Sequence, residues 1–340
     1  MRIAVTGATG HLGRLVIDAL LERGAPAGQV VAVVRDTGRA GDLAARGVQV
    51  RHGDYDQPDT LATALAGTDK VLLVSGSELG QRVEQHRAVV EAAAAAGVRL
   101  LAYTSIPKAD TTPLLLAAEH RATEELIRAS GLPFAFLRNS FYLEVYTGQL
   151  PTYLEHGAIV GAAGDGRVSA ATRADYAAAA AAVLTGDGHD GAVYELGGDD
   201  AFTMTELAAA VSARTGRDIP YRDLPFEEYT RVLTGAGLPE PLAAVVADSD
   251  AGVARGDLLV TTGELSRLIG RPTTPYTDAL AAPAADLLPG PTGSSDTGPA
   301  GFRIFHRHCM GHHGPPGGRD AQRDAPSRLS TPIRRLYGSS

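Results

Sequence analysis

Three glycines spaced three residues apart are the part of this sequence most clearly suited to chemistry. Gly7, Gly10 and Gly13 follow a short apolar segment over residues 1–5 and lead into a stretch with apolar residues at helical spacing. The first glycine permits a tight turn, the second lets the backbone approach a pyrophosphate, and the third lets the helix pack closely on the strand. The N–H groups that open the helix then face an anion. The motif predicts a dinucleotide site, although a glycine turn without a ligand is the alternative.

The residue after the second apolar segment bears on which dinucleotide binds. Arg35 follows the run 30–34, which lies at the spacing of one βαβ unit from the glycine turn. An arginine at this place can pair with a 2′-phosphate, whereas an acidic residue would accept hydrogen bonds from the ribose hydroxyls. NADPH is therefore favoured. Asp36 could reach the ribose instead, so NADH stays an alternative cofactor, and a solvated Arg35 is the alternative without function.

Proton donors for a reductase are scarce. The Tyr-x-x-x-Lys pair of many short-chain reductases would need tyrosine four residues before Lys70 or Lys108, where Ala66 and Thr104 stand. Positioned acid–base groups contribute about 10²–10⁴ in rate, so a substrate that depends on them would react poorly. A quinone depends on them less, because its ring accepts a hydride readily and delocalises the charge. His120, on a predicted helix, has either a polar role at the site or that of an ordinary surface histidine.

The elements that must position these residues alternate regularly. Apolar runs predict strands, and apolar residues at helical spacing predict helices between them, which gives six βα units and hence an α/β fold of the Rossmann type, a doubly wound parallel sheet. Ligands of such sheets bind at the carboxyl ends of the strands. Ser75 and Ser77 follow the fourth strand and belong to that edge. The strands are expected at 1–5, 30–34, 48–52, 70–75, 98–104 and 134–138.

The sequence pattern and the composition divide the chain into three expected regions. Residues 1–150 are expected to form the NADP-binding Rossmann domain, and the shorter elements over 151–288 a smaller α/β lid domain, partly interleaved with the first. That second region includes a predicted strand over 168–171. Residues 289–340 are rich in Pro and Gly and predict a disordered tail. The tail carries His306, His308, Cys309, His312 and His313, but without a folded frame around them no resident metal site is expected.

Composition also indicates which partners and which cellular compartment to expect. A net charge of −8 argues against nucleic acid as a partner. No apolar run approaches the roughly 18 residues of a membrane span, and no signal peptide precedes the first strand. A single cysteine agrees with a reducing compartment, so a cytoplasmic protein is expected. The oligomeric state stays open, with a homodimer as one option.

Several further stretches together resemble a known family, the NmrA-like branch of the atypical short-chain dehydrogenases/reductases. Within it the chain is most similar to the bacterial type 2 NAD(P)H:quinone oxidoreductases, over residues 1–288. The matching stretches are GATGHLG at 7–13, SELGQR at 77–82, AYTS at 102–105, LRNSFY at 137–142, GAAGDG at 161–166, ATRADYA at 171–177, ADSD at 247–250 and LIGRPTT at 268–274.

The resemblance implies NADPH as cofactor and a small-molecule quinone as substrate, reduced by direct hydride transfer. It implies catalytic roles for Asn139 and Tyr142, and His120 is a third catalytic candidate by its place on the predicted helix. Many relatives carry a lysine where His120 stands, four residues before Glu124, which puts unactivated carbonyl substrates in doubt. The alternative function is an NADP-binding redox sensor without turnover. The implied cofactor contacts are Gly7, Thr9, Gly10, His11, Leu12, Arg35, Ser75, Ser77, Arg138, Asn139, Phe141 and Arg173.

Overall fold

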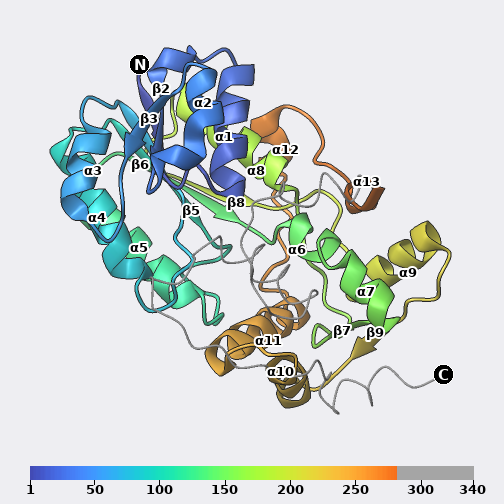
Figure 1. Cartoon of the computed structure of the whole chain (residues 1–340). Helices are drawn as coiled ribbons and strands as arrows, with labels where there is room; N and C mark the ends of the chain where they lie inside the picture. The colour runs from blue at the N-terminus through green and yellow to red at the C-terminus, as the bar shows by residue number, and fades with distance from the viewer. Residues whose placement is uncertain (282–340) are drawn as a thin grey trace, which may run out of the picture. The chain divides into compact units, whose positions relative to one another are not determined.

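A seven-stranded, fully parallel sheet dominates the computed structural model, which describes residues 1–281 (Figure 1). The strand order is β3-β2-β1-β4-β5-β6-β8, so the order reverses next to β1. The predicted Rossmann-type, doubly wound sheet is confirmed. The strands are β1 (Ile3–Val5), β2 (Val30–Val34), β3 (Gln49–His52), β4 (Lys70–Leu73), β5 (Leu100–Ser105), β6 (Phe134–Asn139) and β8 (Ala192–Leu196).

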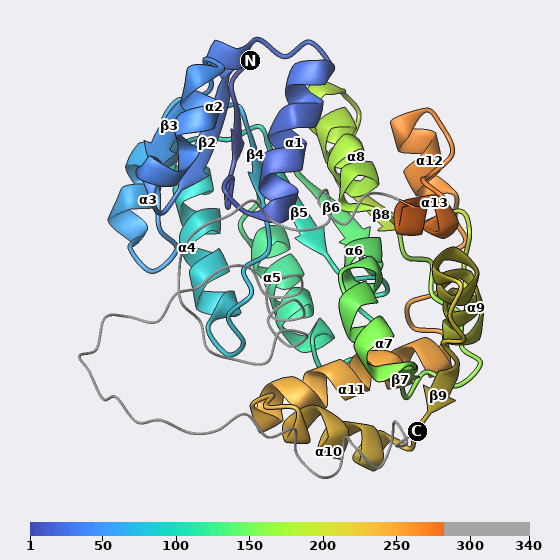
Figure 2. The ribbon, with the colours of Figure 1, turned by 45° about the vertical axis from the view of Figure 1, so that its right-hand side comes forward.

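Helices cover both faces of this sheet, because the strands bury apolar side chains on both sides. In β1, Ile3 and Val5 join the core under one layer, whereas Ala4 joins the core under the other. The first layer has α1 and α8 side by side, as Figure 2 shows, together with α2 and α12. Its helices are α1 (His11–Glu22), α2 (Gly41–Ala45), α8 (Arg173–Thr185) and α12 (Glu264–Ile269). The second layer has α3 (Pro58–Leu65), α4 (Arg82–Ala95) and α5 (Ala117–Ala129).

The chain divides into two units that alternate along the sequence. The first comprises Met1–Leu143, Val168–Ala201 and Asp257–Ala279, and contains the large sheet. It thus takes α8 and β8 from the region expected to form the smaller domain. β8 becomes the seventh strand by pairing with β6, from Ala135 with Ala192 to Asn139 with Leu196. This unit also holds the 3₁₀ turns η1 (Ala27–Gln29) and η2 (Thr37–Ala40).

The second unit comprises, among the described residues, Glu144–Arg167, Phe202–Gly256 and 280–281. Its strands β7 (Ile159–Gly161) and β9 (Tyr221–Asp223) pair in parallel, and α10 packs on α11 through an apolar cluster around Leu242. Thr203 and Glu206 form a capping box at the start of α9. The remaining helices are α6 (Leu143–Thr147), α7 (Leu150–His156), α9 (Met204–Thr215), α10 (Phe226–Gly235), α11 (Glu240–Arg255) and α13 (Tyr276–Ala281), the first and last of which extend across the division.

The predicted strand over 168–171 is wrong. Ala171 accepts a hydrogen bond from Leu143 and donates one to Phe141, whereas Ser169 donates to Leu258 and accepts from Gly198. Since these partners lie on separate segments, no continuous ladder forms.

Two further expectations concern the tail and a membrane span. The predicted tail, with its histidines and its cysteine, lies outside the described residues. Over residues 1–281, the helices include none that is both long enough and apolar enough to cross a membrane.

Candidate functional site

The reversal of strand order brings several predicted residues to one edge of the sheet. β1 pairs with β2 on one side and with β4 on the other, from Ile3 to Val5 in both ladders. The segments that leave the carboxyl ends of these strands are the glycine turn, Arg35 and Ser75–Ser77. A reversal of this kind is where ligands of doubly wound sheets bind. The topology therefore gathers the predicted cofactor residues of the first half of the chain.

The glycine turn has the conformation that its sequence predicts. Gly7 adopts a left-handed φ of 57°, and its carbonyl accepts a hydrogen bond from the Gly10 amide at 2.9 Å. A Cβ atom on Gly13 would lie 2.4 Å from the Gly7 oxygen, so only glycine allows α1 to pack this closely on the turn. Gly10 is the N-cap of α1 and carries no side chain that could cover the first N–H groups. These groups are available to an anion.

Thr6 and Tyr55 join the strand ends beneath this turn. The Thr6 hydroxyl lies 2.5 Å from the Tyr55 hydroxyl and accepts a hydrogen bond from the Val74 amide at 3.1 Å. The Tyr55 hydroxyl donates in turn to the Val74 carbonyl at 3.0 Å. Burial raises the pKa of Tyr55, so the phenol stays protonated. Tyr55 thereby fixes the end of β4 against the end of β1.

The two residues that compete for the choice of cofactor differ in their surroundings. The Asp36 carboxylate caps η2 by accepting a hydrogen bond from the Gly38 amide at 2.9 Å. Arg35 is about half exposed, and its guanidinium lies 3.7 Å from Glu78. The Asp36 carboxylate is thus engaged by the Gly38 amide, whereas the Arg35 side chain lies at the protein surface. This arrangement favours the interpretation of Arg35 as the phosphate-binding residue.

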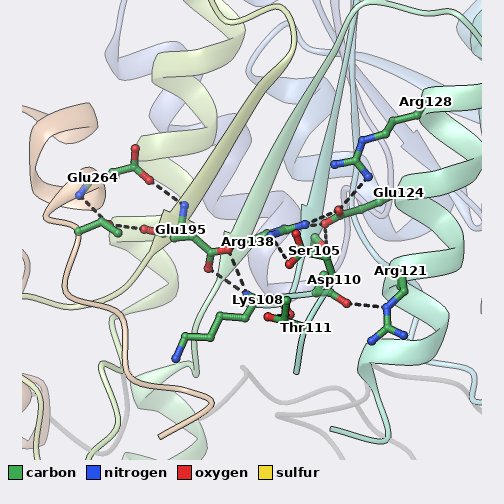
Figure 3. A network of polar contacts seen from close by, with 12 residues as sticks. Ser105, Lys108, Asp110, Thr111, Arg121, Glu124, Arg128, Arg138, Glu195 and Glu264 are labelled. Atoms are coloured by element: carbon green, nitrogen blue, oxygen red, sulfur yellow. Dashed lines mark hydrogen bonds and ion pairs between the residues drawn. The ribbon is translucent and has the colours of Figure 1, made fainter. Parts of the chain in front are cut away.

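Arg138 is a buried residue at the centre of an ion-pair network, shown in Figure 3. Its guanidinium binds both Glu124 oxygens, at 2.9 and 2.7 Å, and also contacts Glu195 at 2.9 Å and Asp110 at 3.1 Å. The Arg138 and Glu124 side chains are 5% and 2% exposed. Burial alone would lower the pKa of Arg138, but the hydrogen bonds to Glu124 and Glu195 outweigh it and raise that pKa. The side chain therefore ties strand ends together, and a contact of Arg138 with a cofactor stays a prediction.

The network also fixes the segment after β5. Ser105 donates to Glu124 at 2.7 Å, and the Lys108 amide donates to the two Glu195 oxygens at 3.1 and 3.0 Å (Figure 3). Lys108 has a φ of 51°, a left-handed conformation that costs a non-glycine residue about 1–2 kcal/mol. The Glu195 carboxylate stabilises this conformation.

Asn139 carries the clearest sign of a missing ligand. It ends β6 and is 6% exposed, and its Oδ1 atom is buried without a hydrogen-bond partner among residues 1–281. A buried acceptor that stays unpaired costs about 1–3 kcal/mol. A bound group that donates to Oδ1 would remove this cost, so Asn139 fits the site role predicted for it.

Tyr142 and Arg173, two of the predicted site residues, lie in contact. The Arg173 guanidinium lies over the Tyr142 ring at 4.5 Å from its centroid, and Tyr176 packs edge-on against that ring at 5.5 Å. Arg173 opens α8 and is 4% exposed. The carbonyl of Phe141 accepts hydrogen bonds from the Ala171 amide and the Tyr176 hydroxyl. The segment after β6 is therefore held by α8, which the sequence did not connect with the large sheet.

His120 is buried rather than at the surface. It is 9% exposed and its Nδ1 atom lies 2.7 Å from the Tyr103 hydroxyl. Burial, helped by the charge of Arg82, lowers the pKa of His120 well below its usual value, so the ring is neutral at physiological pH. A catalytic role for His120 stays a prediction.

The residues that support the site were not among those expected from the sequence. They are polar side chains on buried helix faces and on a late strand: Arg82, Gln85, His86, Glu119, Glu124 and Glu195. Two signals pointed toward this set: Arg82 belongs to the matching stretch SELGQR, and Glu124 lies four residues after the position where many relatives carry a lysine.

Comparisons with known proteins agree with this geometry. The NmrA-like family model matches residues 1–251. The chain is 49% identical to Escherichia coli quinone oxidoreductase 2 over 278 residues, which cover 82% of this chain and 97% of that protein. It is 32% identical to an NAD(P)H azoreductase of Xenophilus azovorans over 284 residues, 83% of this chain and 98% of that one.

Solved structures of related reductases are also similar to this chain. The E. coli NADPH-dependent quinone oxidoreductase QOR2, crystallised with NADPH, matches with 49% identity and a TM-score of 0.80 over 82% of this chain and 98% of its own. A Citrobacter triphenylmethane reductase in complex with NADP(H) is 40% identical, with a TM-score of 0.77 over 83% of this chain and 99% of its own. With its glycine turn, its sheet order and these matches, this chain belongs to the NmrA-like family.

Proposed function

We propose that this protein is an NAD(P)H-dependent quinone oxidoreductase that uses NADPH and reduces a quinone by direct hydride transfer. The observation that carries the proposal is the 49% identity to quinone oxidoreductase 2, which extends over 97% of that protein. The family model matches residues 1–251, a range that includes both the glycine turn and the LRNSFY stretch at 137–142, so the likeness is not limited to a nucleotide-binding motif.

The residues present fit NADPH. The uncapped start of α1 suits a pyrophosphate, and Arg35 suits a 2′-phosphate. The unpaired Oδ1 atom of Asn139 suits a donor such as the carboxamide of a nicotinamide. NADPH supplies the hydride when it is bound.

The protein contributes chiefly orientation. The Tyr142 ring, in contact with both Arg173 and Tyr176, offers a rigid aromatic surface on the same segment as Asn139. His120 is neutral and hydrogen-bonded to Tyr103, so it is not a ready proton donor. A site of this kind suits an acceptor that needs proximity more than acid catalysis, which a quinone does.

The decisive test is NADPH oxidation with and without a quinone. Menadione or a benzoquinone should accelerate the loss of nicotinamide absorbance in proportion to enzyme concentration. Two relatives are named as an azoreductase and a triphenylmethane reductase, so an azo dye and a triphenylmethane dye should be tested as alternative electron acceptors. Tight NADPH binding without acceleration by any of them would contradict the proposal and favour the redox sensor.

A cytoplasmic location and a homodimer complete the proposal. A single cysteine in 340 residues supports a reducing compartment. The chain has a mass of 35.2 kDa, so light scattering on the purified protein distinguishes a dimer from a monomer.

A further inference from the structure

His86 is a buried titratable residue that the proposed chemistry does not use. It lies on α4 with an exposed fraction of 0%, and both of its ring nitrogens have partners. The Gly76 amide lies 2.9 Å from Nε2, and the Thr123 hydroxyl lies 3.0 Å from Nδ1. Gly76 belongs to the loop after β4, between the two serines predicted to contact the cofactor.

The partners determine the protonation of the ring. A backbone amide only donates, so Nε2 must accept the hydrogen bond from Gly76 and the proton of the neutral ring lies on Nδ1. Nδ1 then donates to Thr123, whose hydroxyl donates to the Glu119 carbonyl at 2.9 Å. A protonated ring would direct an N–H group at the Gly76 N–H. The hydrogen bonds therefore require a neutral His86, and burial with the nearby Arg82 charge lowers its pKa to about 3.

A second set of contacts holds the same residue through its carbonyl. Arg82 donates to the Gly76 carbonyl at 2.7 Å and pairs with Glu119 at 2.6 Å. The other Glu119 oxygen accepts the Gly80 amide at 2.8 Å. The loop is thus clamped at Gly76 and Gly80 by α4 and α5. It also packs tightly, since a Cβ atom on Gly76 would lie 3.2 Å from the Gln85 oxygen.

The clamped loop reaches the cofactor residues directly. Ser75 and Ser77 flank Gly76, and Glu78 pairs with Arg35 at 3.7 Å. Glu78 also accepts a hydrogen bond at 3.0 Å from Gln85, the residue just before His86 on α4. Movement of the Gly76 backbone would therefore displace both the serines and the carboxylate that faces Arg35.

We propose that His86 is a positioning residue for the cofactor, because its neutral ring fixes the Gly76 amide and thereby the Ser75–Glu78 loop at the NADPH site. This inference rests on the proposed function. The titratable or charged groups that face the ring are Arg82 on α4, Tyr103 on β5 and Tyr55 after β3, and His120 on α5 follows on the hydroxyl of Tyr103.

The test compares two substitutions at His86. His86→Phe keeps a ring but leaves the Gly76 N–H without its acceptor, and should raise the KM for NADPH about tenfold while kcat at saturation changes much less. His86→Gln retains an acceptor near the Nε2 position and should restore most of the affinity. His189→Phe is the matched control, because His189 pairs with Tyr194 near the amino end of β8, and it should keep the original KM.

Two kinetic outcomes would overturn the inference: an unchanged KM for NADPH in His86→Phe, or a loss confined to kcat. If His86→Phe does not fold, Thr123→Val takes its place, since it removes the acceptor of Nδ1–H and should raise the same KM. Hydrogen exchange at the Gly76 and Gly80 amides gives a readout that needs no cofactor. Unchanged exchange in His86→Phe would overturn the positioning role even if the wild-type protein proved not to bind NADPH.

Discussion

Arg35 shows how a single side chain can carry the choice between two cofactors. It is about half exposed, and its guanidinium lies 3.7 Å from the Glu78 carboxylate. Asp36, the residue that would favour a free ribose, is engaged in capping η2. A phosphate at the 2′ position would offer Arg35 a stronger, charge-assisted partner.

Replacement of Arg35 should therefore affect one cofactor only. Arg35→Gln is expected to raise the KM for NADPH about tenfold or more and to leave that for NADH nearly unchanged, because only the charge-assisted bonds to the phosphate are lost. Steady-state rates with each cofactor measure this. Arg99→Gln is the matched control, because it also removes one positive charge but lies just before β5, at the amino ends of the strands. It should change neither the KM for NADPH nor that for NADH. Equal losses with both cofactors would remove Arg35 from phosphate recognition.

At the scale of elements, the ion pair of Arg138 and Glu124 connects β6 with α5, and Glu195 extends the connection to β8. Neighbouring parallel strands cannot be joined by short turns, and here these side chains add contacts at the strand ends to the backbone ladder of β6 and β8. The pair occupies the strand ends next to Asn139, which places the site on a rigid support. Loss of either side chain would leave the other buried charge without its main compensating partner.

Removal of one charge should be strongly destabilising. Glu124→Gln leaves Arg138 buried with less compensation, and we expect the free energy of unfolding to fall by about 3 kcal/mol. Glu84→Gln is the matched control, because Glu84 is 75% exposed and forms only an i,i+3 pair with Arg87. Exposed pairs contribute about 0–1 kcal/mol, so the control should unfold close to the wild type in urea. Equal midpoints for the two variants would show that the network contributes little.

At the scale of the molecule, the chain returns twice to its first unit. Residues 168–201 supply α8 and β8, and residues 257–279 supply α12, whose Leu265 is completely buried in the core of that unit. The similarity to E. coli quinone oxidoreductase 2 covers nearly all of that protein but only 82% of this chain. The likeness to this relative therefore covers 278 of the 340 residues.

Truncation tests how much of the chain is needed for folding and for activity. A chain that stops after residue 288 should retain the quinone reductase activity and the melting temperature of the full chain. A chain that stops after residue 263 loses α12 and should fail to fold, because Leu265 leaves the core of the first unit. Activity and thermal unfolding of the two truncated proteins measure the difference. A marked loss in the longer one would assign a role to residues 289–340.

Sequence alone determined the alternation of strands and helices, the glycine turn and the place of Arg35. These features depend on short-range causes: apolar runs buried on both faces of a sheet, and backbone positions that a Cβ atom would block, as at Gly13. The family also followed from several short stretches, since each could be compared without knowing its surroundings.

Only the tertiary structure decided which distant residues meet. Arg138 and Glu195 are 57 positions apart, and Gly76 meets His86 only because α4 folds back beside β4. The expected strand over 168–171 failed for the same reason, since its hydrogen bonds go to separate segments. The protonation of His86 and His120 depends on burial. Such features arise from long-range packing, which a local sequence pattern does not encode.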